Sequence, residues 1–351
     1  MAKKRKQKKT FKFILKIVIS FVLLVGLSLG GVFYKAVYWS NIKELNQDNN
    51  FLYISSDAKF DDVIEIIRSK NLLVNLSSFR WTAEVMNYSK HIYPGKYRVE
   101  KGMSNRDLLL MLRTGKQEEV KIMFGKIRGK RKLAKYFADN LEVDYEEMYS
   151  MLTDPYYQKD YGFTPHTIMS MFIPNTYNFN WNTNAKMVFD RMYGEYKKFW
   201  TSSRISKGRA LDLGLTKIDI ITLASIVEEE TYMNVEKPKI AGVYLNRLRK
   251  GMKLQADPTV RFAVGDFNIK RVLNKHLRIE SPYNTYKYKG LPPGPICIPS
   301  IKSVDAVLNP ASHDFLYFCA KPDFSGYHNF ANNYAQHLRY ARMYQKKLKS
   351  K

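Results

Sequence analysis

The chain has 351 residues, with 58 Lys and Arg against 32 Asp and Glu and a formal net charge of +26. That length leaves room for two or three domains, each with its own core. Only two cysteines occur, Cys297 and Cys319, which excludes a framework of several disulfides; we expect two buried free thiols, and one disulfide in an oxidising compartment is the alternative. The six scattered histidines show no metal-ligand spacing, so no metal or other cofactor is expected.

The N-terminus combines a basic tail with an apolar segment. Eight Lys and Arg lie within residues 1–16, and residues 17–34 are uncharged. The apolar run continues to about residue 39, which is long enough for a helix to cross the core of a bilayer. Because basic flanks stay on the cytoplasmic side, we expect a single-pass anchor in the cytoplasmic (inner) membrane, with the rest of the chain extracytoplasmic. A cleaved signal peptide is the alternative, but the run is long for one and no clear cleavage site follows it.

The exported part is basic even without this tail, because removing the eight tail charges leaves +18. Such a surface can attract nucleic acid, anionic lipid head groups or an anionic wall polymer. Export argues against nucleic acid as a partner. A solvated basic face that keeps the protein soluble explains the charge equally well.

A weak internal repeat follows a short polar spacer. Residues 54–70 match residues 99–115, and Asp62 aligns with Asp107. Each copy predicts the end of a strand, a turn and then a helix. Paired units of this kind suit a compact α+β module, although chance similarity between two amphipathic helices is the alternative.

The remainder of the chain predicts helices separated by ordered loops. Helices are expected over residues 131–160, 184–200, 235–251 and 332–348. Residues 171–181 predict an ordered loop or a short strand. Downstream of residue 251 the chain is rich in Pro, Gly, Asn and Tyr, and irregular loops of this kind often carry functional sites.

Residues 217–233 carry the strongest chemical signal, because an apolar helix pattern runs into Glu228, Glu229 and Glu230. A carboxyl group at the end of an apolar face is poorly solvated as the anion, so its pKa rises and it can donate a proton near neutral pH. Helical periodicity places Glu229 on the more polar stripe but does not choose between Glu228 and Glu230. A solvated acidic helix turn is the alternative.

Two downstream segments add candidate ligand-binding groups. Asp257 precedes Pro258, which predicts a helix N-cap with proline at the first helical position and a helix that stops at Gly265. Gln255 can face a ligand from the preceding turn. In residues 281–290, tyrosines interleave with Asn and Thr; aromatic rings stack on sugar rings, but the same segment equally suits an edge strand.

These motifs together resemble the YceG-like family of MltG-type endolytic murein transglycosylases, over roughly residues 50–345. The segments that carry the resemblance are FIPNTY (172–177), ASIVEEET (224–231), VYLNRL (243–248), GMKLQADPTV (251–260), SPYNTY (281–286), GLPPGPI (290–296), NPA (309–311) and LYF (316–318). Several separate motifs in one order make the resemblance far more specific than any single motif.

The resemblance implies an α+β fold in four parts. These are a cytoplasmic basic tail (1–16), a transmembrane helix (17–39), a small LysM-like module (40–125) and a larger mixed α/β catalytic domain (126–351). It also implies that the essential glutamate is the first after the SIV run, which here is Glu228. The expected substrate-binding residues are Gln255, Asp257, Thr259, Tyr283, Asn284, Tyr286 and Glu230.

The implied reaction is cleavage of the β-1,4 bond between MurNAc and GlcNAc within peptidoglycan glycan strands. Glu228 would protonate the glycosidic oxygen and then, as carboxylate, take the proton from the C6 hydroxyl of MurNAc, which gives a 1,6-anhydro end without water. Penicillin-binding proteins and the elongation machinery are the implied partners. A membrane-anchored scaffold that binds glycan without cutting it is the alternative; a nucleic-acid binder would explain the charge but not the acidic run.

Overall fold

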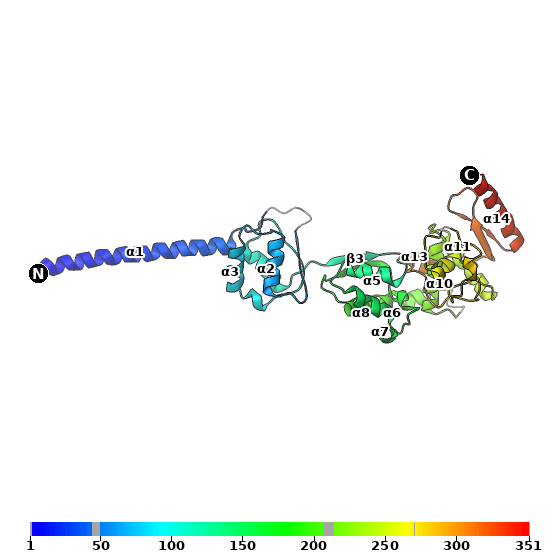
Figure 1. Cartoon of the computed structure of the whole chain (residues 1–351), viewed down its shortest axis with the longest axis horizontal. Helices are drawn as coiled ribbons and strands as arrows, with labels where there is room; N and C mark the ends of the chain where they lie inside the picture. Colours follow the sequence, from blue (N-terminus) through cyan, green and yellow to red (C-terminus); the bar gives the residue numbers. More distant parts are fainter. Residues whose placement is uncertain (1, 44–49, 207–213, 270, 351) are drawn as a thin grey trace. The chain divides into compact units, whose positions relative to one another are not determined.

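The computed structural model describes residues 2–43, 50–206, 214–269 and 271–350, which form two compact units (Figure 1). The first unit comprises residues 1–120 and 179–182, and the second comprises residues 121–178 and 183–351. The described residues form helices and three two-stranded sheets. The fold is therefore mixed α/β, in agreement with the expected class.

The first unit begins with one long helix, α1 (Ala2–Tyr38). Its segment Phe11–Tyr38 is apolar, and its side chains are mostly exposed to the surroundings. By length and composition, this segment can cross a membrane, and it covers nearly all of the predicted span. The residues that precede it are mostly basic and include no acid.

The rest of the first unit is a small α+β module. Strand β1 (Phe51–Ile54) pairs antiparallel with β2 (Gly95–Arg98). The helices of the module are α2 (Phe60–Ser69), α3 (Leu76–Val85), the 3₁₀ turn η2 (Tyr88–Lys90) and α4 (Asn105–Thr114). Buried apolar side chains from all of these elements, among them Leu52, Ile64, Phe79 and Leu108, form one core. The sheet and helices thus share a single interior.

The internal repeat corresponds to a strand and a capped helix in each copy. At the start of α2, Asp62 accepts a hydrogen bond from the backbone N–H of Lys59 at 2.8 Å. At the start of α4, Asp107 accepts one from the backbone N–H of Ser104 at 3.1 Å. The aligned aspartates therefore have the same capping role, because each accepts a hydrogen bond from a backbone N–H that has no partner within the helix.

The second unit begins with a two-stranded sheet, β3 (Val120–Phe124) beside β4 (Asn175–Phe179). The helices between and after these strands are α5 (Lys130–Ala138), α6 (Tyr145–Thr153), α7 (Pro155–Lys159), the 3₁₀ turn η3 (Ile168–Met171), α8 (Ala185–Phe199) and α9 (Ser202–Ser206). In Figure 1 these elements appear mainly in green, with α5 drawn next to β3 and with α6, α7 and α8 drawn below α5. The region predicted to be helical, 131–160, thus contains three helices.

The centre of the second unit is the helix that ends in the three glutamates, α10 (Lys217–Glu230). Thr216 and Asp219 form a capping box at its start, and residues 220–227 are all buried. It packs against α11 (Lys237–Arg249), α12 (Asp257–Val264) and α13 (Ile301–Leu308). A helix buried on all sides is rigid, so its C-terminal residues are held in fixed positions.

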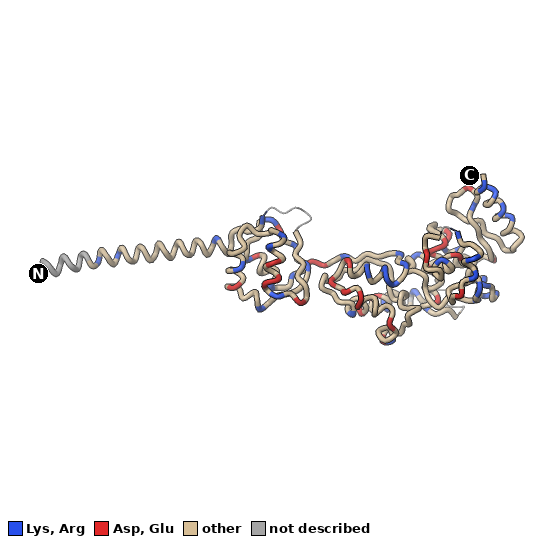
Figure 2. The backbone as a smooth tube through the Cα atoms, viewed as in Figure 1, with Lys and Arg blue, Asp and Glu red and all other residues tan. Residues whose placement is uncertain are grey.

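The chain ends in a hairpin and a helix. Strands β5 (Tyr317–Ala320) and β6 (His328–Ala331) pair antiparallel, and α14 (Tyr334–Lys349) packs against both. Figure 2 shows Lys and Arg recurring along α14, whose last turn contains Lys346, Lys347 and Lys349. The two cysteines are free: Cys297 is buried and Cys319 is partly buried.

Candidate active site

The three glutamates at the end of α10 lie in three different environments. Successive helical residues are rotated by about 100°. Glu228 contacts residues at the start of α13, Glu229 contacts the segment before α5, and Glu230 contacts α11. One acidic run therefore supplies three separate carboxylates.

The carboxyl group of Glu230 is held by Tyr244, whose hydroxyl donates a hydrogen bond to Oε1 at 2.5 Å. Burial raises the pKa of Glu230 to about 7. The hydrogen bond from Tyr244 and the positive charge of Arg247 lower this pKa, whereas the negative charge of Asp257 raises it. Near neutral pH a large fraction of Glu230 is therefore protonated and able to donate a proton.

Glu230 lines a cavity of about 430 Å³ that is formed by α10, α11, α12, the β5–β6 hairpin and α14. The other lining residues are Tyr244, Arg247, Gln255, Asp257, Tyr286, Tyr317, Phe318, Cys319, Ala320, His328, Tyr334 and His337. Aromatic rings, an amide and several titratable groups thus surround one protonatable carboxyl. A cavity of this composition suits a polar ligand with flat faces, such as a sugar chain.

Asp257 points into this cavity and accepts a hydrogen bond from the hydroxyl of Tyr286 at 2.5 Å. The prediction that Asp257 is the N-cap of its helix is wrong, because Ala256 is the N-cap and Asp257 is the first helical residue. The predicted end is confirmed: α12 runs to Val264, and Gly265 follows in the left-handed conformation. Because the carboxylate of Asp257 does not cap the helix, it lines the pocket.

Gln255 lies beside these groups. Its φ is +49°, in the left-handed region that residues other than Gly and Asn rarely adopt. Its backbone N–H donates to the carbonyl of Thr285 at 3.1 Å, which holds this conformation. The side chain of Gln255 is exposed in the pocket. Strained backbone of this kind is found preferentially at functional sites.

Glu228 differs from the expectation that it would be kept neutral. Its Oε2 accepts hydrogen bonds from the hydroxyls of Ser300 and Ser303, at 2.5 and 2.6 Å, and from the ammonium group of Lys237 at 2.9 Å. Burial by itself raises the pKa of Glu228, but these donors together hold it below its ordinary value. The expected raised pKa is therefore wrong for Glu228, because charged and polar donors reach it from α11 and α13.

Glu229 is also ionised. Arg128 donates two hydrogen bonds to its carboxylate, at 2.7 and 2.6 Å, and Lys126 lies 3.0 Å away. Burial raises the pKa of Glu229, but these two cations together lower it below its ordinary value. Glu229 therefore joins α10 to the segment before α5 as a structural ion pair.

The remaining predicted residues do not join Glu230 in its cavity. Thr259 and Asn284 are fully buried. Thr259 donates to the carbonyl of Ala256, and Asn284 donates to the carbonyls of Leu277 and Ile279. They shape the loops that carry the pocket and do not line it.

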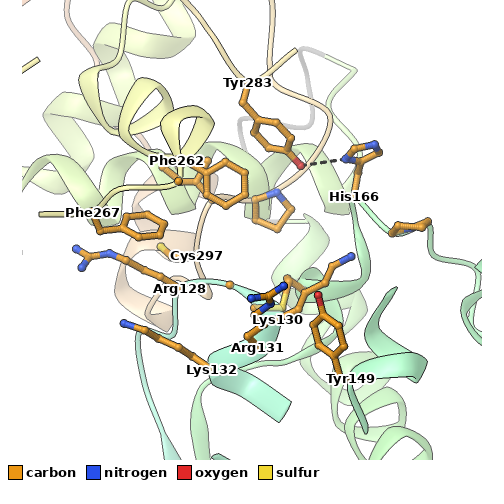
Figure 3. A pocket seen from close by; sticks show the side chains of 16 residues that line it. Arg128, Lys130, Arg131, Lys132, Tyr149, His166, Phe262, Phe267, Tyr283 and Cys297 are labelled. Carbon is orange, nitrogen blue, oxygen red and sulfur yellow. Dashed lines mark hydrogen bonds between the residues drawn. The ribbon is translucent and has the colours of Figure 1, made fainter. Parts of the chain in front are cut away.

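Tyr283 lies in a second cavity, where its hydroxyl is 3.3 Å from Nδ1 of His166 (Figure 3). The structure thus brings together Glu230, Gln255, Asp257 and Tyr286, and it separates them from Tyr283.

Sequence reasoning missed three groups that line the pocket, Tyr244, Arg247 and His328. The guanidinium group of Arg247 donates to the carbonyls of Leu254 and Leu316, both at 2.6 Å, and so joins α11 to the two segments that border the cavity. Tyr244 and Arg247 belong to the VYLNRL motif, which signalled the family but assigned no role to its members.

Comparisons with known proteins identify the family of the chain. The model of the YceG-like family matches residues 52–343. An endolytic murein transglycosylase of Bacillus subtilis (strain 168) is 40% identical over 157 residues, which cover 44% of this chain and 42% of the relative. An endolytic murein transglycosylase of Streptococcus pneumoniae (strain R6) is 27% identical over 360 residues, which cover 92% of this chain and 64% of the relative. The chain therefore spans less than two thirds of the length of these curated relatives.

The fold is also similar to a solved structure. The crystal structure of a YceG-like protein from Listeria monocytogenes superposes with a TM-score of 0.55 at 26% sequence identity. The match covers 82% of this chain and 97% of the other.

Proposed function

The chain belongs to the YceG-like family, and from this membership we propose that it is an endolytic murein transglycosylase. The substrate is the peptidoglycan glycan strand, cut internally at the β-1,4 bond between MurNAc and GlcNAc. The observation that carries the proposal is a carboxyl group with a pKa of about 7, Glu230, that lines a cavity together with Gln255, Asp257 and Tyr286.

Glu230 acts first as acid and then as base. As the neutral acid, it gives its proton to the glycosidic oxygen that leaves C1 of MurNAc. As the resulting carboxylate, it takes the proton from the C6 hydroxyl of the same sugar, whose oxygen then attacks C1. The product is a 1,6-anhydro end. The nucleophile is part of the substrate, so its proximity contributes to the rate and no second catalytic carboxylate is required.

The neighbours of Glu230 make both steps feasible. Burial keeps the acid protonated near neutral pH, while the hydroxyl of Tyr244 is placed to stabilise the carboxylate once the proton has left. Asp257 and Tyr286 form a hydrogen-bonded pair that orients both groups toward the sugar hydroxyls. Gln255 supplies an exposed amide for an N-acetyl group or a hydroxyl.

The resemblance by sequence assigned the acid role to Glu228, which makes the two glutamates competing candidates. The hydroxyls of Ser300 and Ser303 and the ammonium group of Lys237 lower the pKa of Glu228, and Glu228 does not line the cavity around Glu230. A carboxylate that already accepts these bonds carries no proton to give at neutral pH. We therefore assign Glu228 to holding α10, α11 and α13 together.

The test is digestion of purified sacculi by the full-length chain in detergent, with mass spectrometry of the released anhydro-muropeptides. Glu230→Gln should lower the rate by about 10²–10⁴-fold, the range for loss of a general acid–base group. Glu228→Gln, scored per folded molecule, should retain most of the activity. The reverse result would return the acid role to Glu228, and glycan binding by wild type without any product would favour a scaffold.

The remaining parts fit an enzyme of the membrane surface. Helix α1 would anchor the chain once, with its basic N-terminus in the cytoplasm and the later residues outside the cytoplasmic membrane. The α+β module within residues 40–125 would be LysM-like and bind N-acetyl sugars, and residues 126–351 would form the catalytic domain. Such an enzyme would work beside penicillin-binding proteins and the elongation machinery.

A further inference from the structure

The second unit contains another cavity, of about 460 Å³, which shares no lining residue with the cavity around Glu230 (Figure 3). Its walls come from the segment before α5, the start of α5, α6, η3, α12 and the loops that precede η3, follow α12 and precede α13. The lining residues are Arg128, Gly129, Lys130, Arg131, Lys132, Tyr149, Pro165, His166, Met169, Phe262, Gly265, Phe267, Tyr283, Pro295, Ile296 and Cys297.

One wall of this cavity is strongly basic. Four cations, Arg128, Lys130, Arg131 and Lys132, line it, and no Asp or Glu stands among its lining residues. Glu229 neutralises Arg128 from outside the cavity. Burial lowers the pKa of Lys130, which is the expected effect on a cation brought out of water without an anion beside it.

Helix stability does not account for this cluster. Lys130, Arg131 and Lys132 occupy the first turn of α5, and the N-cap, Gly129, provides no side-chain hydrogen bond. Cations in the first turn are unfavourable because the N-terminal end of a helix carries partial positive charge. The three charges therefore cost stability where they stand, and an anionic ligand in the cavity would offset that cost.

The opposite walls are aromatic. Phe262 packs against Tyr283 with ring centroids 4.5 Å apart, and Phe267 lines the same side. Tyr149 is close to Arg131, whose guanidinium carbon lies 5.8 Å from the ring centroid. Figure 3 shows these rings around the basic residues. Such a cavity fits a ligand with an apolar body and an anionic end, whereas a small inorganic anion would leave the rings without contact.

We propose that this cavity binds a short peptide that carries free carboxylates, and that on the substrate this ligand is the stem peptide attached to the glycan strand. The identification of the stem peptide rests on the proposed function, but the binding of an acidic peptide does not. Lys130, Arg131 and Lys132 pair with the carboxylates, and the rings of Phe262, Phe267 and Tyr283 pack on the apolar side chains.

Binding is measured by titration calorimetry of the full-length chain in detergent with a synthetic muramyl peptide. The second ligand is the same peptide with its carboxylates amidated. Wild type should bind the free acid at least about tenfold more tightly than the amide, since a charge-assisted hydrogen bond contributes enough for a tenfold difference. Equal affinity for the two peptides, or no binding of either, would overturn the proposal. Displacement of the free acid by millimolar inorganic phosphate would assign the site to phosphate and overturn it as well.

Lys130→Gln tests the site itself, and Lys135→Gln is its matched control. Both residues lie on α5 and both changes remove one positive charge, but Lys135 is an exposed residue paired with Asp139 and does not line the cavity. Lys130→Gln should weaken binding of the free acid about tenfold, and Lys135→Gln should leave it unchanged. Equal effects would mean that net charge alone attracts the peptide, which contradicts a built site.

A cleavage assay separates this proposal from the proposed function. With intact strands, Lys130→Gln should raise KM, whereas with strands stripped of peptides by an amidase it should behave like wild type. If wild type cuts neither substrate but binds the acidic peptide, the proposed function fails and the peptide site stands. If wild type cuts both with the same KM and binds no peptide, the peptide site fails and the enzyme stands.

Discussion

Glu228 and Glu230 are two residues apart on one helix, yet their carboxyl groups have opposite pKa shifts. Burial acts on both in the same direction. The hydroxyls of Ser300 and Ser303 and the buried ammonium group of Lys237 overcome burial at Glu228. At Glu230 the hydrogen bond from Tyr244 and the positive charges of Arg247 and Arg261 do not overcome it. Burial favours the proton-donating form of both acids, and the partners of each carboxyl group decide whether that effect is overcome.

The largest effect on stability is expected from Glu228→Gln. The side chain of Lys237 is only 4% exposed, so this change leaves an ammonium group buried without its counterion. Breaking a buried ion pair costs about 3–5 kcal/mol of the free energy of unfolding, which chemical denaturation measures. The double variant Glu228→Gln/Lys237→Met should recover much of that loss. A loss below about 1 kcal/mol in the single variant would mean that the pair is not stabilising the ionised form.

Glu230→Gln should have the opposite effect and raise the free energy of unfolding at alkaline pH. The folded pKa of about 7 lies above the ordinary value of 4.5, so ionisation of Glu230 destabilises the fold as pH rises from about 4.5 to about 7. The neutral amide escapes this penalty. At pH 8 the variant should be more stable than wild type by up to about 3 kcal/mol, and at pH 4 the two should be equal. If the variant exceeded wild type in stability by more at pH 4 than at pH 8, the raised pKa would be contradicted.

For Glu228 the same linkage has the reverse sign. Its folded pKa is lowered, so it contributes stability above its ordinary pKa and loses that contribution as pH falls through the folded pKa. The destabilisation by Glu228→Gln should therefore shrink in acid. Opposite pH dependences in the two variants would establish that one helix end holds one anion and one acid.

The sequence could predict α10 but not the fates of its glutamates. Its apolar run is a local signal, and the helix begins at Lys217 as expected but ends at Glu230, three residues before the end of the predicted stretch. The donors to Glu228 include Ser300 and Ser303, which lie more than seventy residues later in the chain. Periodicity describes the faces of one helix and carries no information about which distant segment covers each face.

The lack of information about distant segments also explains why the roles predicted for Asp257 and Asn284 differ from the structure. The dipeptide Asp-Pro predicts a helix start, and the structure has one, but a difference of one residue decides whether the carboxylate caps the helix or faces the pocket. An asparagine amide can bind a sugar, but the amide of Asn284 instead donates hydrogen bonds to the carbonyls of Leu277 and Ile279. Family motifs located the segments correctly, whereas the direction of each side chain depended on tertiary contacts.

A moderate effect on the pH dependence of catalysis is expected from Tyr244→Phe. Cleavage by a protonated acid should fall as pH rises through about 7, the pKa of Glu230. The hydroxyl of Tyr244 lowers this pKa by its hydrogen bond to the carboxylate, so its removal should move the alkaline limb of the rate profile to higher pH. Tyr136→Phe, which removes a hydroxyl bonded to the carbonyl of Met123, is the control and should leave the limb in place. An unchanged limb in Tyr244→Phe would separate Glu230 from the proton transfer.

The smallest effect on stability, with a distinct effect on activity, is expected from Gln255→Gly. The φ of +49° strains a glutamine, and glycine adopts this conformation without strain, so the fold should gain about 1 kcal/mol. The side chain that lines the cavity of Glu230 is lost, so cleavage should weaken while stability rises. Asn87→Gly is the matched control, because Asn87 also has a positive φ, +52°, and does not line this cavity. It should leave cleavage unchanged, and its gain in stability should be smaller because asparagine tolerates the left-handed region. Wild-type cleavage by a stabilised Gln255→Gly would show that neither the side chain of Gln255 nor the strain in its backbone contributes to the function of the pocket.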